Sequence, residues 1–267
     1  MAGELNGQRP VPAIPVLNRI ACLQQRSYRD QSHLFYSEGV RNFIAALDSG
    51  CEVETLVYSE RLLTSPLARK LVRQTKRAGV PFATLSPEQI RQVSLSERAS
   101  GVGAILHQAI RPLPGLTPRP KSCWIALEDV RLPGNFGTLI RSASATGVDG
   151  FVLLGDRIDP YDPAVVRASM GAIFGQRLAR ATFDEFRRWV RQHKLHVVGA
   201  SPDGTVDYDR VEYRRPTALM LGEERKGLSA RQRSLCHQLV RIPMRPGSDS
   251  LNLGVAGSLL LYQILRE

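Results

Sequence analysis

The chain has 267 residues, with 36 Lys and Arg against 25 Asp and Glu, which gives a formal net charge of +11. No apolar run approaches the roughly 20 residues that a membrane-spanning helix needs, and the first 18 residues carry three prolines without the apolar stretch of a secretory signal. The four cysteines form no CxxC pair, so neither a zinc site nor a disulfide framework is indicated. We therefore expect a cytoplasmic protein without a metal. The positive charge favours a nucleic-acid phosphate backbone as a partner, although many basic proteins bind no nucleic acid.

The proline-rich stretch RPLPGLTPRPK, residues 111–121, is the main landmark for domain organisation. Proline fixes φ and lacks an amide donor, so this stretch is predicted to be a linker and not a helix or a central strand. The sequence then divides into a flexible tail at 1–20, a small α/β domain at 21–110, the linker, and a second domain at 122–267.

The first domain alternates helical and strand patterns. We expect a helix from Val40 to Leu47 that ends before Gly50. The next helix has an apolar side at Leu67, Leu71 and Val72. Its basic side carries four residues: Arg69, Arg73, Lys76 and Arg77. Strands are predicted at 53–58, 81–85 and 103–107.

The second domain repeats the alternation with short, apolar strands. Strands are predicted at 123–127, 151–154, 197–200, 218–221 and 239–242. Helices are predicted at 136–146, stopping at Gly147, at 183–193, and at 251–265. Another helix begins at Ser229, with Gln232 completing a capping box. Such strands, separated by helices, imply an α/β fold with a mostly parallel sheet covered on both faces.

Three segments at predicted strand ends carry polar residues and glycines that packing does not require, and ligands of parallel sheets bind at such ends. They are NFGTLIRSA at 135–143, LMLGEERKGLS at 219–229 and VRIPMRPGSDSLNLGVA at 240–256. Each also has an ordinary explanation. Asn135 is a plausible helix cap, Glu223 a solvated acid beside Arg225 and Lys226, and Ser250 a common cap residue.

Taken together, in this order, the three segments resemble the motifs of the SpoU (TrmH) family of the SPOUT superfamily, written NxGTxxRSA, LGxExxGLS and IPM…SLN. The resemblance covers residues 122–267. It implies S-adenosylmethionine-dependent methylation of ribose 2′-hydroxyls in RNA, a trefoil knot formed by the C-terminal segment, and a homodimer. The absence of GxGxxG weighs against the Rossmann-like methyltransferase fold.

The resemblance also implies residue roles. The cofactor-binding positions, which act largely through their backbone, are Leu221, Gly222, Ile242, Met244 and Leu251. The catalytic positions are Arg141, Asn135, Glu223, Ser250 and Asn252. Because arginine is almost never deprotonated in proteins, we expect Arg141 to stabilise a developing alkoxide, an RNA phosphate taking the proton. Asn135 and Asn252 position Arg141 and the substrate, Glu223 orients the first motif, and Ser250 supports the site.

The upstream domain resembles the α/β RNA-binding domain that precedes the SpoU core in ribosomal RNA methyltransferases and is related to ribosomal proteins. This resemblance rests on FYSEGVRNFIAAL, residues 35–47, and on the strand order. It favours ribosomal RNA as the substrate. The basic side of the helix, Arg69, Arg73, Lys76 and Arg77, is expected to bind the RNA backbone, and a solvated helix face is the other explanation of these charges. There are two alternatives. The substrate is transfer RNA, or the protein is a non-catalytic RNA-binding protein that kept the knot.

Overall fold

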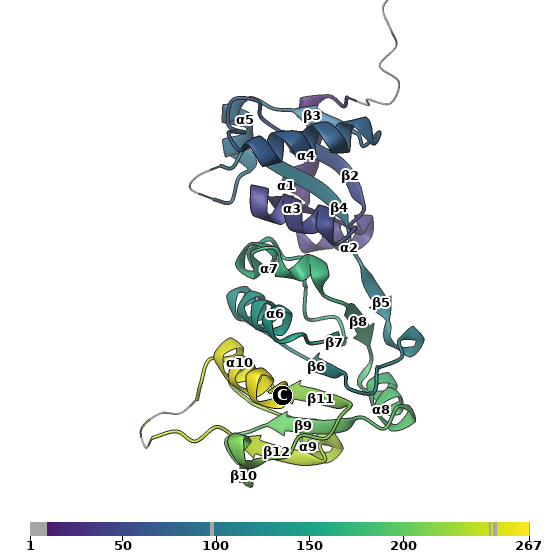
Figure 1. The fold of residues 1–267 in the computed structure, drawn as a ribbon, viewed down its shortest axis with the longest axis vertical. Helices are drawn as coiled ribbons and strands as arrows, with labels where there is room; N and C mark the ends of the chain where they lie inside the picture. The colour runs from purple at the N-terminus through teal and green to yellow at the C-terminus, as the bar shows by residue number, and fades with distance from the viewer. Residues whose placement is uncertain (1–9, 97–98, 246, 248–249, 267) are drawn as a thin grey trace, which may run out of the picture. The chain divides into compact units, whose positions relative to one another are not determined.

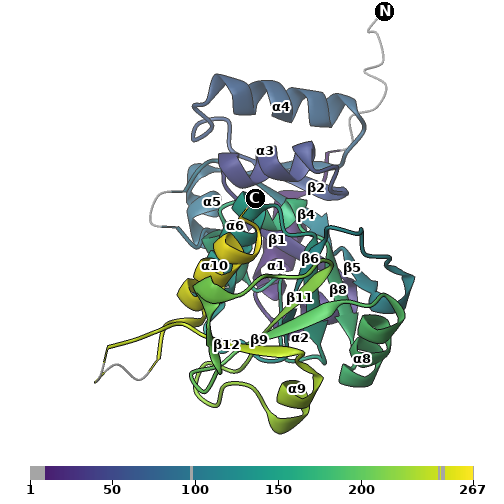
Figure 2. The same ribbon diagram turned by 60° about the horizontal axis from the view of Figure 1, so that its bottom comes forward.

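A computed structural model describes residues 10–96, 99–245, 247 and 250–266. The chain folds as two compact units (Figures 1 and 2). The first unit combines the residues up to Gln108 with Tyr161–Gly175, and the second combines Ala109–Pro160 with Gln176–Glu267. No helix in the described part of the chain is long and apolar enough to cross a membrane.

The first unit is built on a four-stranded sheet with the order β1-β4-β2-β3. Its strands are β1 (Leu34–Glu38), β2 (Val53–Tyr58), β3 (Phe82–Thr84) and β4 (Val102–His107). β4 is antiparallel to both of its neighbours, and β2 and β3 are parallel. The predicted strand at 53–58 is confirmed without change, and those at 81–85 and 103–107 are confirmed with slightly shifted ends.

Helices cover both faces of this sheet. One core contains buried side chains of α1 (Ala13–Cys22) and α5 (Pro87–Val93). The other face is covered by α3 (Val40–Asp48), α4 (Pro66–Arg77) and α7 (Pro163–Ser169). A short helix, α2 (Arg26–Ser32), precedes β1.

The prediction of a flexible tail at 1–20 is wrong for its second half. Val16 and Ile20 of α1 are buried, because α1 presents an apolar side to the sheet. Residues 1–9 lie outside the described residues.

The segment Tyr161–Gly175 belongs to the first unit, although it comes from the middle of the predicted second domain. The rings of Tyr161 and Phe174 pack on Phe35 of β1, with centroids 4.4 Å and 6.3 Å away. The burial of these aromatic rings against β1 explains why the segment packs with the first unit and not with its neighbours in the sequence.

The second unit contains an eight-stranded sheet with the order β10-β12-β9-β11-β6-β7-β8-β5, in which every pair is parallel. Its central strands are β6 (Cys123–Leu127), β7 (Gly150–Leu154), β9 (His196–Ala200) and β11 (Thr217–Leu221). The outer strands are β5 (Ile110–Pro112), β8 (Leu178–Ala181), β10 (Val206–Asp207) and β12 (Gln238–Arg241). The predicted parallel sheet is therefore confirmed.

Two pairs of helices cover the two faces of this sheet. α6 (Pro133–Thr146) and α10 (Leu253–Ile264) lie side by side on one face, where Ser142 and Ser258 share a hydrogen bond of 2.6 Å (Figure 1). α8 (Phe183–Gln192) and α9 (Ala230–Leu235) cover the other face. The predicted capping box of Ser229 and Gln232 opens α9, and Gly147 ends α6 in the left-handed conformation, at φ 77°.

The proline-rich stretch 111–121 is not a free linker. β5 pairs with β8, the side chain of Leu113 is fully buried, and the indole nitrogen of Trp189 donates to the carbonyl of Leu116 at 2.7 Å. Proline is compatible with β5 because the strand lies at the edge of the sheet, where an amide donor is not needed.

Candidate functional site

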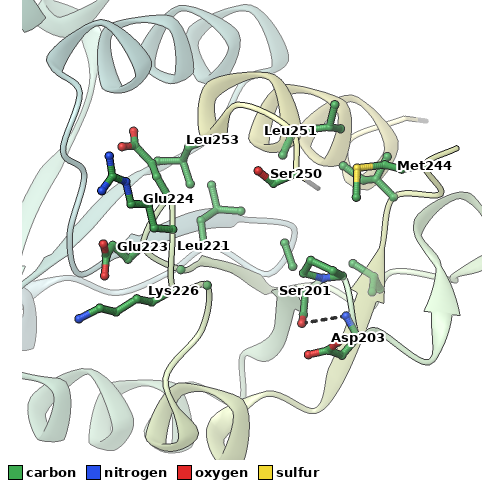
Figure 3. Close-up of a pocket in the computed structure, with 18 of the residues that line it drawn as sticks. Ser201, Asp203, Leu221, Glu223, Glu224, Lys226, Met244, Ser250, Leu251 and Leu253 are labelled. Atoms are coloured by element: carbon green, nitrogen blue, oxygen red, sulfur yellow. Dashed lines mark hydrogen bonds between the residues drawn. The ribbon is translucent and has the colours of Figure 1, made fainter. Parts of the chain in front are cut away.

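The carboxyl ends of β9, β11 and β12 meet at one edge of the sheet and border a cavity of about 520 Å³ (Figure 3). The segments that follow these strands form its walls. The apolar part of the wall contains Leu221, Ile242, Met244, Leu251, Leu253 and Ala256. The charged part contains Asp203, Glu223, Glu224, Arg225, Lys226 and Arg233. A cavity of this size, apolar with a few polar groups, is typical of a small-molecule site.

All five residues predicted to bind the cofactor, Leu221, Gly222, Ile242, Met244 and Leu251, line this cavity. Among the described residues, the backbone N–H groups of Ile242, Met244 and Leu251 have no hydrogen-bond partner. Leu251 is exposed and Ile242 and Met244 are half-buried, so these N–H groups remain open to solvent or to a ligand that accepts hydrogen bonds.

A tight turn from Glu223 to Gly227 forms one side of the cavity. Two backbone hydrogen bonds close it, Glu223 N–H to Gly227 C=O at 3.1 Å and Gly227 N–H to Glu223 C=O at 2.8 Å. Gly227 has a φ of 64°, which glycine adopts without strain. A Cβ atom on Gly222 would overlap the backbone of Gly227. The two glycines of the second motif thus fix the shape of the turn.

Three motif side chains are joined in one hydrogen-bonded chain. Asn135 donates from Nδ2 to Oε1 of Glu224 at 2.6 Å, and Asn252 donates from Nδ2 to Oδ1 of Asn135 at 2.6 Å. Asn252 Oδ1 also accepts the N–H groups of Gly254 and Val255, so it caps α10. Asn135 does not cap α6, because that helix starts at Pro133 and Asn135 lies in its first turn. The three motifs are therefore brought together by side chains far apart in the sequence.

Glu224, and not the predicted Glu223, contacts the first motif. Glu223 instead pairs with Arg131 at 2.8 Å between Nε and Oε1, in the loop before α6. Its Oε1 lacks the alignment of a hydrogen bond. The spacing of LGxExxGLS, counted from Leu221, places its glutamate at 224, so the sequence already contained the signal that the assignment to Glu223 missed.

Arg141 lies on α6, six residues after Asn135, or about 9 Å further along the helix axis. Its side chain is exposed, it does not line the cavity, and no described residue forms an ion pair or hydrogen bond with it. Ser250 is exposed at the cavity wall. Thus the structure brings Asn135, Asn252 and Glu224 together, whereas Arg141 stands apart within this chain.

The predicted RNA-binding helix α4 belongs to the first unit. Arg69, Arg73 and Arg77, which recur every four residues, are exposed on it. Lys76 is half-buried, with Nζ 4.0 Å from the ring centroid of Phe82 and donating to the hydroxyl of Tyr58 at 3.0 Å. Lys76 thus takes part in packing. Leu67, expected on the apolar side, is 53% exposed.

Comparison with known proteins shows which family has this sequence and this site. Residues 122–262 match the SpoU rRNA Methylase family, and residues 15–104 match the MRM3-like substrate binding domain. A 23S rRNA (uridine(2479)-2′-O)-methyltransferase of Streptomyces viridochromogenes is 30% identical, over 98% of this chain and 95% of that protein.

Solved structures agree over the full length. The AdoMet-bound rRNA methyltransferase from Sinorhizobium meliloti has a TM-score of 0.87 at 33% identity, covering 98% of both chains. The SpoU methyltransferase AviRb from Streptomyces viridochromogenes, in complex with AdoMet, has a TM-score of 0.86 at 28% identity, covering 94% of this chain and 97% of that one. The chain therefore belongs to the SpoU rRNA Methylase family.

Proposed function

We propose that this protein transfers a methyl group from S-adenosylmethionine to a ribose 2′-hydroxyl of RNA, and that the RNA is ribosomal. The observation that carries the proposal is the cavity at the carboxyl ends of β9, β11 and β12, where all five expected cofactor positions meet. The names of two full-length relatives, one methylating 23S rRNA and one holding AdoMet, support it. We also propose a cytoplasmic location, as expected from the sequence.

The residues of the cavity fit S-adenosylmethionine. Leu221, Ile242 and Leu251 offer apolar surface to an adenine ring, and the free N–H groups of the lining residues suit the ring nitrogens of the adenine and the hydroxyl oxygens of the ribose. The wall also carries the carboxylates of Asp203 and Glu223, each already paired with an arginine, Arg233 at 3.0 Å and Arg131 at 2.8 Å, so the polar part of the wall is balanced in charge. When bound there, the cofactor supplies an electrophilic methyl group.

The proposed knot is supported by the path of the C-terminal segment. β12 lies between β9 and β10, near one edge of the sheet, yet α10, which follows it, packs on α6 beside the centre. The chain therefore goes from a strand near the edge of the sheet, which ends at Arg241, to a helix beside its centre, which begins at Leu253. Such a passage is the step at which the family threads its chain.

In the proposed mechanism, the guanidinium of Arg141 stabilises the negative charge that develops on the attacking ribose oxygen. An RNA phosphate accepts the proton, because arginine keeps its own. Asn135 and Asn252, joined to Glu224, hold the start of α6 against the cavity wall. An exposed arginine without a partner among the described residues is ready for a substrate oxyanion, since no internal carboxylate must first release it.

The separation of Arg141 from the cavity supports a site completed by two chains. The exposed apolar residues of α10, Val255, Leu259 and Tyr262, recur at positions i, i+4 and i+7 and form a stripe on a helix that packs on α6. We propose that this stripe forms a homodimer interface that brings Arg141 of each chain to the cavity of its partner. Burial of such a stripe is favourable at about 25 cal/mol per Å².

A subunit-mixing experiment tests both the reaction and the shared site. Arg141→Ala should abolish methyl transfer while leaving cofactor binding intact, and a Gly222→Trp variant should abolish cofactor binding. Each is inactive alone. Mixing the two should restore up to about a quarter of wild-type methylation of 23S rRNA, since half of the dimers are mixed and each mixed dimer has one complete site. No recovery in verified mixed dimers contradicts the shared site, and wild-type turnover by Arg141→Ala contradicts its role.

The proposed RNA contacts of the first unit are Arg69, Arg73 and Arg77, without Lys76, which is engaged in packing. Transfer RNA remains the alternative substrate, because several relatives are described only as tRNA/rRNA methyltransferases. Mapping 2′-O-methyl sites in RNA from cells with and without the gene decides between them. Loss of a methyl group from ribosomal RNA supports the proposal, and loss from transfer RNA alone contradicts it.

A further inference from the structure

Arg225 and Lys226 form the tip of the turn that borders the cavity. Both side chains are exposed, and both line the cavity mouth. Neither forms an ion pair or hydrogen bond with any described residue. Two adjacent free cations therefore stand at the entrance to the proposed methylation site.

The backbone under these cations is held in one conformation. The turn is closed by the two hydrogen bonds between Glu223 and Gly227, and the backbone of Gly227 packs directly on Gly222. A group held in place before binding loses less conformational entropy when it captures a ligand. The tip is thus better suited to binding than two cations on a loose loop.

The acidic residues next to the tip do not neutralise it. The carboxylate of Glu223 is paired with Arg131, and that of Glu224 accepts a hydrogen bond from Asn135. Each acid is thus directed to α6 or the loop before it, and the positive charge of Arg225 and Lys226 remains available to an external anion.

The direction of Lys226 helps to decide whether the tip binds an anion inside the cavity or one that arrives from solvent. Lys226 extends from the turn away from Leu221 and Ser250, which border the cavity interior (Figure 3). An anion inside the cavity, such as the carboxylate of a bound amino-acid group, lies on the other side of the turn. An anion that reaches the cavity from solvent meets the tip first.

We propose that Arg225 and Lys226 bind a backbone phosphate of the RNA strand close to the nucleotide that is methylated. The guanidinium of Arg225 matches two phosphate oxygens, and the ammonium of Lys226 adds a point charge. They are positioning residues, which hold the strand while its ribose enters the site. This inference rests on the proposed function.

The test compares Arg225→Ala/Lys226→Ala with Arg188→Ala/Arg191→Ala, a control that removes two exposed cations from α8 and the same net charge. Affinity for in vitro transcribed 23S rRNA is measured at several salt concentrations, and affinity for S-adenosylhomocysteine is measured by calorimetry without RNA. For the tip variant, the slope of log K against log salt should fall by about 0.7 to 0.9 for each phosphate that the variant no longer binds. The affinity for S-adenosylhomocysteine should stay within about twofold of wild type, and the control should keep the wild-type slope.

Two results overturn the inference. In the first, the tip variant and the control change the salt slope equally, so that the effect is only one of net charge. In the second, the tip variant binds S-adenosylhomocysteine more weakly and keeps the salt slope, so that the anion is the cofactor carboxylate. Methyl incorporation by the wild-type protein is scored separately, because its absence contradicts the proposed function, whereas the binding comparison tests the tip.

Discussion

Glu223 and Glu224 are adjacent in the sequence, but their carboxylates have different partners. Glu224 accepts from Asn135, which in turn accepts from Asn252, whereas Glu223, whose side chain is 13% exposed, pairs with Arg131 without the alignment of a hydrogen bond. Glu224 thus joins side chains of all three motifs through aligned hydrogen bonds, whereas Arg131 lies outside the motifs. The link through Glu224 should therefore matter more for the alignment of the three motifs.

The two matched variants Glu224→Ala and Glu223→Ala test this difference. Removing Glu224 frees Asn135 and Asn252, so the first and third motifs lose their alignment, and we expect the rate constant of methyl transfer to fall about tenfold or more, as for the loss of a charged hydrogen bond of about 1.5–3 kcal/mol in the transition state. Removing Glu223 should cause a loss several times smaller than the loss caused by removing Glu224. Single-turnover methylation at saturating cofactor measures both, and a larger loss for Glu223→Ala would contradict the assignment.

Gly222 offers a second prediction at this scale. Gly222→Ala places a Cβ against the backbone of Gly227, so the turn must move, and the affinity for S-adenosylmethionine should fall by tenfold or more. The control is Gly134→Ala on α6, where a Cβ meets no atom within 4 Å. The control should keep the cofactor affinity and leave stability equal or slightly higher, because alanine favours a helix over glycine. Calorimetry and thermal melting measure both, and unchanged affinity for Gly222→Ala would sink the idea.

Among the elements, β5 and the short turn after it are the ones whose role differs most from expectation. The side chain of Leu113 is fully buried in the same core as Trp124 and Trp189, while β5 extends the sheet beyond β8. The apolar residues between the prolines thus carry packing energy.

Leu113→Ala should therefore destabilise the protein by about 2–5 kcal/mol, the range for removing a buried leucine side chain. Leu132→Ala, at a position that is 57% exposed, is the control and should change stability by no more than about 0.5 kcal/mol. Urea unfolding followed by tryptophan fluorescence reports on this core directly. Equal stability of the two variants would restore the interpretation of 111–121 as a linker.

At the scale of the whole molecule, the chain passes between the two units three times, after Gln108, Pro160 and Gly175. A fragment cut at residue 122 therefore lacks β5 and Leu113 of its own sheet. It also keeps Tyr161–Gly175, whose aromatic rings pack on β1, a strand that the fragment does not contain.

We predict that residues 122–267 alone are much less stable than residues 109–267. The longer fragment keeps the complete eight-stranded sheet and the cavity residues, so it should bind S-adenosylmethionine, and it should methylate RNA poorly because the substrate-binding unit is missing. Thermal melting, calorimetry and turnover on the two fragments check these outcomes. Comparable melting of both fragments would show that β5 is dispensable, and full RNA turnover by the longer one would contradict the role of the first unit.

The sequence by itself determined the local elements and the motif positions of this protein. A short apolar run located the strand 123–127, β-forming residues located 53–58, and the capping box located the start of α9, because these signals depend on neighbours in the chain. The second and third motifs also identified the residues that meet at the cavity, since parallel strands share one carboxyl edge.

Only the tertiary structure decided which partners these residues find. The choice of Glu224 over Glu223, the packing of Leu113 and the transfer of Tyr161–Gly175 to the first unit depend on contacts between segments far apart in the chain. A helical or strand pattern shows that a face is apolar, but it does not show which surface covers that face. The same limit explains why α1 was expected to be a tail, because a short amphipathic helix is stable only when a sheet accepts its apolar side.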